Sequence, residues 1–224
     1  MEDVGGRGRD GRPAAPRAAR KRVSGSTCGC QGAAVTTAPA SSIDGSRGCL
    51  ILSGVPGAGK STVSALVARA LPRCAVVNAD ALAMMVRSGW VGPADEPADE
   101  ARAQLVLRAR GACLLAGSFS EAGFFPVIDH VVADAAMLDA MLGWLAPSPV
   151  WLVTLAPDLT TSARRNEERP VEEQIDYDIS GLDARIREEL RDRGWYFDTS
   201  ALDAAATARR ILDEVPRRAV VLRG

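Results

Sequence analysis

Residues 54–61 constrain the fold of this chain more than any other stretch. They read GVPGAGKS, and the spacing G-x-x-x-x-G-K-S is set by Gly54, Gly59, Lys60 and Ser61. A short apolar run at 49–52 precedes them, as in a buried strand, and residues 60–71 place apolar side chains at helical spacing. In this order, the glycines let backbone N–H groups close on phosphate oxygens at a helix N-terminus. The segment therefore predicts a phosphate-binding loop (P-loop) and nucleotide binding.

The lysine of this loop is one of only two in the chain, Lys21 and Lys60, against twenty-five arginines. Arg and Lys do similar work at most surface positions, but not where a compact ammonium on a flexible stem is needed. The retained Lys60 therefore favours a functional motif over a chance match in a glycine turn. Such a lysine reaches the β- and γ-phosphates, and the Ser61 hydroxyl binds Mg²⁺. We expect nucleotide contacts from Gly54, Gly57, Ala58, Gly59, Lys60, Ser61 and Thr62.

Charge divides the chain into two parts. Residues 1–47 hold eight Lys/Arg and four Asp/Glu, a charge of +4. The other residues hold nineteen Lys/Arg and twenty-four Asp/Glu, a charge of −5, and the two parts together give the net charge of −1. The first part is rich in Gly, Pro and Arg and predicts a disordered basic tail, followed by one folded domain over 48–218. A nucleic-acid contact by the tail is the alternative to a solvated extension. The acidic folded part argues against a nucleic-acid partner.

Two further sequence features bear on location. No apolar run approaches the ~20 residues that span a bilayer, and the N-terminal residues lack the apolar segment of a secretory signal. The five cysteines are odd in number and scattered, which argues against a disulfide framework. We expect a cytoplasmic protein without a membrane partner.

Strand and helix patterns alternate after the P-loop. Strands are expected at 74–77, 124–129 and 150–155, and 195–200 is expected to hold the last strand and its exit. Helices are expected at 81–86, 98–116, 133–145, 182–193 and 203–215. This alternation predicts an α/β fold, in which a parallel sheet carries helices on both faces.

Asp80 lies just past the carboxyl end of the second predicted strand. Ligands of open α/β sheets bind at the carboxyl ends of the strands, where a carboxylate can accept a proton from a substrate hydroxyl. The alternative is a helix N-cap, which is a common position for Asp. Asp129 ends the next strand signal and is a candidate Mg²⁺ ligand or base. Its neighbour His130, the single histidine, is read either as a proton-transfer group or, in preference, as an ordinary strand-end residue.

Three arginines at 164, 165 and 169 follow the fourth predicted strand. Arg165 and Arg169 are four residues apart and share a helical face, so both guanidinium groups can point at a phosphate site and stabilise a transferring phosphoryl group. The alternative is a solvated face paired with the nearby glutamates. A separate segment, 84–90, holds apolar side chains that line either an apolar acceptor pocket or the core. They are Met84, Met85, Val86 and Trp90.

Taken together, GVPGAGKST, the NAD of 78–80, Asp129, LAPDLTTSARRNEERP and WYFDTSALD resemble the P-loop small-molecule kinases. The nearest group is the chloramphenicol phosphotransferase-like set of AAA-type P-loop kinases, and the resemblance covers residues 49–215. It implies a three-layer, nucleoside-monophosphate-kinase-like P-loop NTPase with a parallel five-stranded sheet flanked by helices. It implies ATP and Mg²⁺ as cofactors, and transfer of the γ-phosphoryl group to a hydroxyl of a small molecule, including an antibiotic.

The resemblance also implies roles for single residues. Asp80 matches the base that deprotonates the acceptor, and Arg165 and Arg169 match the lid arginines. Thr199 falls where the family turns into its last helix beside the adenine. Where relatives end the third strand in two acids, this chain has Asp129-His130, so the base and metal roles of Asp80 and Asp129 stay exchangeable.

Two other functions compete with a small-molecule kinase. One is a nucleic-acid end kinase, and the other is an ATP-binding regulatory NTPase without phosphoryl transfer. The sequence predicts no particular acceptor, nucleotide base or oligomeric state.

Overall fold

The computed structural model of the protein describes residue 43 and residues 47–171, 174–175 and 178–222. Its strands are β1 (Cys49–Ser53), β2 (Cys74–Asn78), β3 (Phe125–Asp129), β4 (Val150–Leu155), β5 (Trp195–Phe197) and β6 (Val220–Leu222). Its helices are α1 (Lys60–Ala70), α2 (Ala79–Ala83), α3 (Ala98–Glu121), α4 (Ala135–Leu145), α5 (Leu159–Glu167), α6 (Ser180–Leu190) and α7 (Ala204–Arg218). None of these helices is long and apolar enough to cross a membrane.

The strands form one sheet in the order β2-β3-β1-β4-β5. All four pairings along this path are parallel, which confirms the predicted α/β class. The short β6 adds an antiparallel pairing to the start of β4, where Val150 faces Leu222. This strand was not predicted, and it lies past residue 218, where we expected the domain to end.

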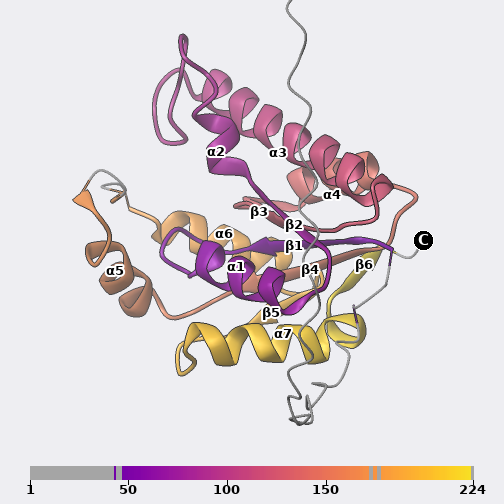
Figure 1. Cartoon of the computed structure of the whole chain (residues 1–224). Coiled ribbons are helices and arrows are strands. Elements are labelled where there is room, and N and C mark those ends of the chain that lie inside the picture. The colour runs from indigo at the N-terminus through magenta and orange to yellow at the C-terminus, as the bar shows by residue number, and fades with distance from the viewer. Residues whose placement is uncertain (1–42, 44–46, 172–173, 176–177, 223–224) are drawn as a thin grey trace, which may run out of the picture. The chain divides into compact units, whose positions relative to one another are not determined.

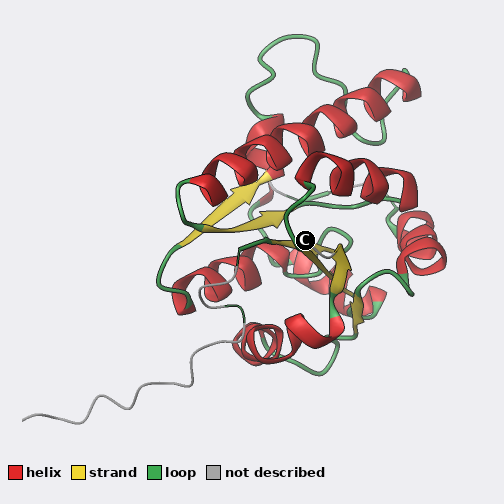
Figure 2. Ribbon diagram, turned by 90° about the vertical axis from the view of Figure 1, so that its right-hand side faces the viewer, coloured by secondary structure: helices red, strands yellow, loops and turns green. Residues whose placement is uncertain are grey.

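Helices cover both faces of the sheet (Figures 1 and 2). α1 and α7 pack together on one face, while α3 and α4 pack together on the other. The central strands β1, β3 and β4 are buried along their whole length, as expected for a parallel sheet between two helical layers. The fold is therefore the predicted three-layer arrangement.

Pro126 lies inside the central strand β3, although proline cannot donate a ladder hydrogen bond. The N–H groups of a strand point alternately to its two neighbours. Phe125 donates to Arg73 on the β2 side and His130 donates to Leu52 on the β1 side, so the nitrogen of Pro126 faces β1. The β1–β3 pairing begins only at Val127, so the missing donor falls where no ladder bond is required.

Few residues of the predicted tail are described. Ile43 is fully buried and belongs to the hydrophobic core, although we expected it in a disordered segment. Arg47 is exposed, and the other residues of 1–47 lie outside the described part of the chain.

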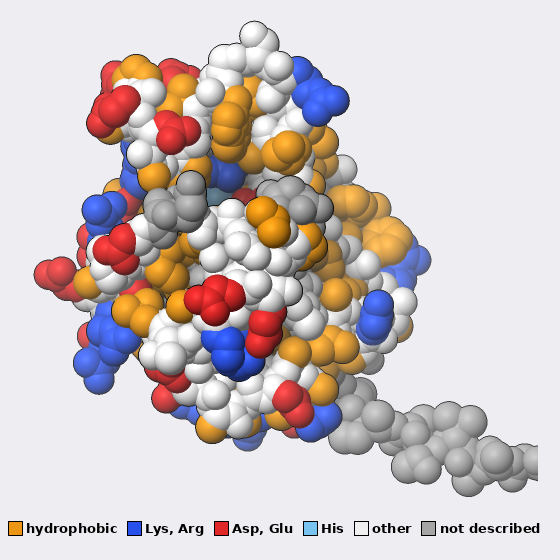
Figure 3. Space-filling model, turned by 90° about the vertical axis from the view of Figure 1, so that its left-hand side faces the viewer, with side chains coloured by type: hydrophobic (Ala, Val, Ile, Leu, Met, Phe, Trp, Pro, Cys, Tyr) orange, Lys and Arg blue, Asp and Glu red, His pale blue; other side chains and the backbone are white. Residues whose placement is uncertain are grey.

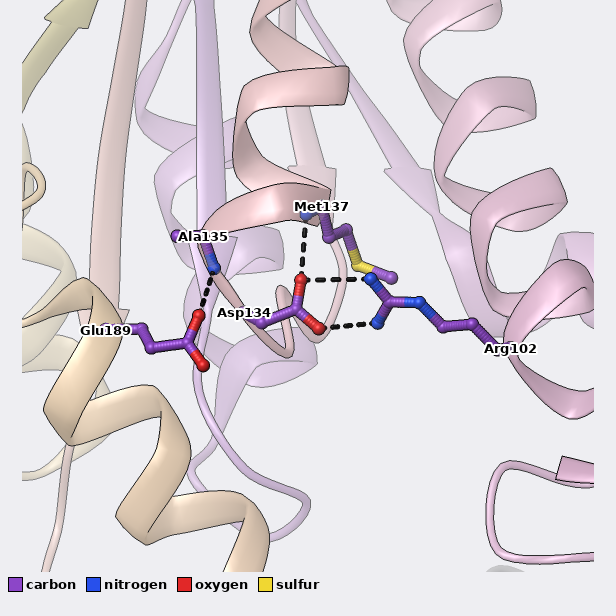
Figure 4. A network of polar contacts seen from close by, with 5 residues as sticks. All are labelled: Arg102, Asp134, Ala135, Met137 and Glu189. Atoms are coloured by element: carbon purple, nitrogen blue, oxygen red, sulfur yellow. Dashed lines mark hydrogen bonds and ion pairs between the residues drawn. The ribbon is translucent and has the colours of Figure 1, made fainter. Parts of the chain in front are cut away.

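A polar network fixes the start of α4 against two other helices (Figure 4). Asp134 caps α4 by accepting a hydrogen bond from the backbone N–H of Met137 at 2.8 Å. Both of its carboxylate oxygens also accept from the Arg102 guanidinium on α3, at 2.6 and 3.0 Å. From α6, Glu189 accepts from the backbone N–H of Ala135 at 2.9 Å. The network ties α3, which carries part of the site described below, to α4 and α6.

Candidate active site

The P-loop follows β1 at the carboxyl edge of the sheet. Gly54, Gly57 and Gly59 have φ values of 137°, 82° and 92°, which side chains rarely adopt. A Cβ on Gly57 would lie 2.4 Å from the carbonyl oxygen of Ser162, and one on Gly54 would lie 2.4 Å from that of Leu155. These glycines therefore shape the loop and also let α5 and the end of β4 approach it closely.

Lys60 lies under the loop at the start of α1. Its ammonium donates to the carbonyl oxygens of Gly54 at 2.9 Å and Val55 at 3.2 Å, and the residue is 8% exposed. Burial lowers the pKa of Lys60, while the nearby Asp129 and Asp80 carboxylates act in the opposite direction. The cation is thus held inside the site where phosphate would meet it.

Asp129 ends β3 beside the P-loop and is 5% exposed. Burial raises its pKa, whereas Lys60 and a hydrogen bond with the Ser61 side chain lower it. Its Oδ2 atom has no hydrogen-bond partner in the described part of the chain. A buried carboxylate with a vacant oxygen beside a hydroxyl fits Mg²⁺, which takes one or two protein oxygens and completes its shell with phosphates and water. The described residues hold no group of three His, Cys, Asp or Glu that would form an all-protein metal site.

His130 is 3% exposed and follows Asp129. Burial, with the nearby charges of Arg108 and Lys60, lowers its pKa to about 3. The imidazole is therefore neutral at physiological pH. Its Nε2 atom is buried and has no hydrogen-bond partner among the residues that the structure describes. A strand-end histidine ordinarily bonds to the backbone or to solvent, but this Nε2 atom does neither within the described residues.

The arginines after β4 separate into two kinds. Arg165 on α5 turns toward the P-loop and donates to the carbonyl oxygen of Ala58 at 3.4 Å. Arg169 lies just past the end of α5, yet it lines a cavity beside the P-loop together with Arg165. Arg164 instead forms an exposed pair with Glu168 at 2.7 Å, as the solvated-face alternative predicts.

A cavity of about 310 Å³ opens beside the P-loop. Its walls come from the loop, α1, the α5 segment and the turn from β5 into α7, and include Gly57, Ala58, Gly59, Thr62, Arg165, Glu168, Arg169, Thr199, Leu202 and Thr207. Thr199, 2% exposed, has a buried hydroxyl without a hydrogen-bond partner in the described residues. Thr199 therefore lines the same cavity as four of the predicted nucleotide contacts, although it lies far from them in the sequence. These four are Gly57, Ala58, Gly59 and Thr62.

Asp80 lies in the first turn of the short helix α2. The cap of this helix is Asn78, whose side-chain oxygen accepts from the backbone N–H groups of Asp80 at 2.8 Å and Ala81 at 3.2 Å. The N-cap alternative for Asp80 is therefore wrong. Its side chain is 81% exposed and lies 3.4 Å from the guanidinium of Arg108.

Arg108 and Gln104 were missed by sequence reasoning. They lie one turn apart on α3 and are 9% and 8% exposed. Gln104 donates to the carbonyl oxygen of Gly89 at 2.7 Å and accepts from the backbone N–H of Val91 at 3.1 Å. The guanidinium of Arg108 lies 5.6 Å from the ring centre of Trp90. The available signal was that Gln104 and Arg108 fall at the helical spacing of small apolar residues of the same segment, but which face of α3 is buried depends on how the helix packs.

Figure 3 looks onto the face that carries α2, α5 and the P-loop, which lies to the left in Figure 1. The surface is hollowed near its middle, and blue and red side chains lie inside the hollow. Charges of both signs therefore meet in a recess, as phosphate binding and acid–base chemistry require.

Comparison with known families decides the family of the chain. A family model named AAA_33 and described as an AAA domain matches residues 50–193. The chain belongs to this family. The matched part of this AAA domain includes the P-loop, Asp80, Asp129 and the α5 arginines, while Thr199 and α7 lie beyond it. No curated protein matches the chain.

Solved structures share the fold of this AAA domain. A sugar kinase from Janibacter sp. HTCC2649 has a TM-score of 0.55 and 16% identity, covering 74% of this chain and 92% of its own. The tunicamycin resistance protein of Deinococcus radiodurans has a TM-score of 0.54 and 19% identity, covering 78% and 99%. A gluconokinase from Sinorhizobium meliloti 1021 has a TM-score of 0.53 and 20% identity, covering 76% and 93%. At these identities the similarity shows a common fold.

Proposed function

We propose that the protein is an ATP-dependent kinase that transfers the γ-phosphoryl group to a hydroxyl of a small molecule. The observation that carries this proposal is the arrangement around Lys60. Lys60 is buried under the P-loop, Arg165 donates to the loop carbonyl of Ala58, and Arg169 lines the same cavity as the loop. The names of two structural neighbours, a sugar kinase and a gluconokinase, agree with the proposal.

Each side chain has a role that its position supports. Lys60, Arg165 and Arg169 offset the negative charge of the phosphates, and the cavity beside the P-loop takes the nucleoside. Asp80 accepts the proton of the acceptor hydroxyl while the oxygen of that hydroxyl attacks the γ-phosphorus. The bond from that phosphorus to the bridging oxygen breaks, so ADP leaves and a phosphate ester forms.

Ser61 and Asp129 are the residues that would hold Mg²⁺. The ion supplies charge neutralisation at the β- and γ-phosphate oxygens when it is bound. Asp129 is buried and Asp80 is exposed, which favours Asp129 as the metal ligand and Asp80 as the base.

The segment after Asp80 favours an acceptor molecule that has a large apolar part. Met84 and Met85 are 68% and 70% exposed, so the alternative that they belong to the core is wrong. Trp90 is 43% exposed. These side chains suit an aromatic or lipophilic alcohol, and an antibiotic of that kind stays within the proposal. A tunicamycin resistance protein is among the structural neighbours.

The protein is incubated with ATP, Mg²⁺ and a panel of hydroxylated compounds, and each compound is examined by mass spectrometry for a gained phosphoryl group. The panel holds chloramphenicol, aminoglycosides, nucleosides, sugars and shikimate. We expect one class to gain the group and Lys60→Ala to abolish the product. ATP binding without any product would instead favour the regulatory NTPase. Nucleic acids with free 5′-hydroxyl ends are offered separately, and a product on these ends alone would favour the end kinase.

Asp80→Asn tests the base. We expect turnover to fall about 10²–10⁴-fold, the usual contribution of a general base, while ATP affinity is kept. Turnover equal to that of the wild type would remove Asp80 from the mechanism.

A further inference from the structure

Arg108 is a nearly buried cation on the acceptor side of the site. It is 9% exposed, although the same helix α3 also carries Arg110, which is exposed. Its guanidinium lies 3.4 Å from Asp80 and 5.6 Å from the ring centre of Trp90. Its charge also acts on His130 at the end of β3. Arg108 is thus the residue at which α2, the Trp90 segment and the sheet edge meet.

The proposed role of Asp80 as a base requires a neighbouring residue that holds its carboxylate in one orientation. Asp80 is on a helix of five residues, and its side chain is 81% exposed. Within the described part of the chain, the Asp80 carboxylate accepts a hydrogen bond from Arg108. A general base must lie within hydrogen-bond reach of the proton that it takes, and an exposed aspartate on a short helix has several rotamers open to it. A fixed cation at one carboxylate oxygen selects among them and leaves the other oxygen for the acceptor.

The second contact of Arg108 orders the loop that faces Asp80. Gln104, one turn earlier on α3, holds the backbone of Gly89 and Val91 on either side of Trp90. Arg108 then lies against the indole itself. Because both side chains project from the same face of α3, one rigid helix sets the distance between the candidate base and the candidate apolar wall.

We propose that Arg108 is a positioning residue of the acceptor site, which orients the Asp80 carboxylate and sets the Trp90 side chain beside it. The inference rests on the proposed kinase function for its kinetic part. Arg108 neither gives nor takes a proton, because its guanidinium stays charged throughout. It acts through Asp80, and this distinguishes it from Lys60, Arg165 and Arg169, which act on the phosphates.

A double-mutant cycle with Asp80→Asn and Arg108→Met tests this dependence, on whichever panel compound gains a phosphoryl group. We expect Arg108→Met to lower kcat about 10–100-fold in the wild type and less than about 3-fold in Asp80→Asn, because residues that act as a unit are not additive. Arg108→Lys keeps the charge and should recover part of the loss. KM for ATP should be unchanged. Equal losses in both backgrounds, or no loss, would overturn the proposal.

Arg102→Met is the matched control. Arg102 also projects from α3 and also pairs with an aspartate, but that aspartate caps α4. We expect a lower melting temperature and the same factor in kcat in both backgrounds. A larger loss in the wild type than in Asp80→Asn for this control would show that any weakening of α3 imitates the result, and would overturn the specific role of Arg108.

A readout without substrate separates this proposal from the kinase proposal. The emission of Trp90 is obtained as the difference between the wild type and Trp90→Phe, and again in the Arg108→Met background. We expect a shift in that difference spectrum when the guanidinium is removed. An unchanged spectrum overturns the positioning role even if a product forms. Absence of any product on the panel overturns the kinase proposal instead and leaves the spectrum to decide the placement of Trp90.

Discussion

Gly57 shows what a single residue does in this site. Its φ of 82° is left-handed, and its missing side chain lets the carbonyl of Ser162 lie where a Cβ would collide with it. α5 carries Arg165, so the same glycine that shapes the phosphate loop also brings a cation to it. The proposed phosphate contacts of the loop and the position of Arg165 therefore both depend on the absence of a side chain at Gly57.

Gly57→Ala should weaken nucleotide binding by pushing α5 away from the loop. Strain in the left-handed region and overlap with a backbone atom together cost about 2–5 kcal/mol, so we expect ATP affinity to fall at least about 10-fold. Isothermal titration calorimetry measures the change. Gly143→Ala is the control, since a Cβ there meets nothing within 4 Å and alanine favours a helix by up to about 1 kcal/mol. Equal ATP affinity for Gly57→Ala and the wild type would contradict the prediction.

Among the elements, α3 carries Gln104 and Arg108, which border the proposed acceptor side of the site. It is anchored by Arg102 at its start, and it presents Gln104 and Arg108 on later turns. The Arg102 guanidinium holds the pKa of Asp134 below its ordinary value of 3.8. A depressed carboxyl pKa means that the folded state favours the ionised form, so this stabilisation is present above 3.8 and is lost as the pH falls through and below it.

Asp134→Asn tests the anchor of α3. Asparagine still caps a helix, so the substitution removes mainly the ion pair with Arg102, and we expect a loss of about 1–2 kcal/mol in the free energy of unfolding at pH 7. The difference from the wild type should be smaller at pH 3, because the stabilisation by the ionised carboxylate is lost progressively as the pH falls below 3.8. Urea denaturation at both pH values measures it.

The control for this prediction is Asp139→Asn, which breaks the more exposed pair with Arg193. It should change the unfolding free energy by less than about 0.5 kcal/mol. A pH-independent effect of Asp134→Asn would show that capping, and not charge, carries the stabilisation.

At the scale of the whole molecule, the candidate nucleotide cavity joins parts that are distant in the chain. Its walls belong to the P-loop, α1, α5 and the turn into α7. A ligand bound only by the folded state stabilises it through mass action. A bound nucleotide should therefore stabilise the whole folded domain against unfolding.

ATP with Mg²⁺, at 100 times its Kd, should raise the free energy of unfolding by about 2.7 kcal/mol. Differential scanning fluorimetry follows the change as a rise in Tm with nucleotide concentration. Lys60→Ala should abolish the rise. A wild-type Tm that does not respond to ATP would argue against nucleotide binding in this cavity.

The sequence predicted those features that depend on neighbouring residues. The strand, glycine loop and helix of residues 49–70 form a local pattern, and so do the apolar runs of the parallel strands. Arg108 could not be assigned because its role depends on which face of α3 meets α2. β6 has three residues, too few for a periodic signal, and Asn78 was overlooked as a cap because Asp80 stands two residues later.

The reversed direction of β6 has a practical consequence for anyone who labels this protein. The strand pairs Leu222 with Val150, the first residue of β4, so the polypeptide departs from the sheet at the end opposite to Leu155 and the P-loop. An affinity tag or a fluorophore joined after residue 222 would be attached on the side of the sheet away from the recess. A protein molecule immobilised through that tag would have its recess facing the solution.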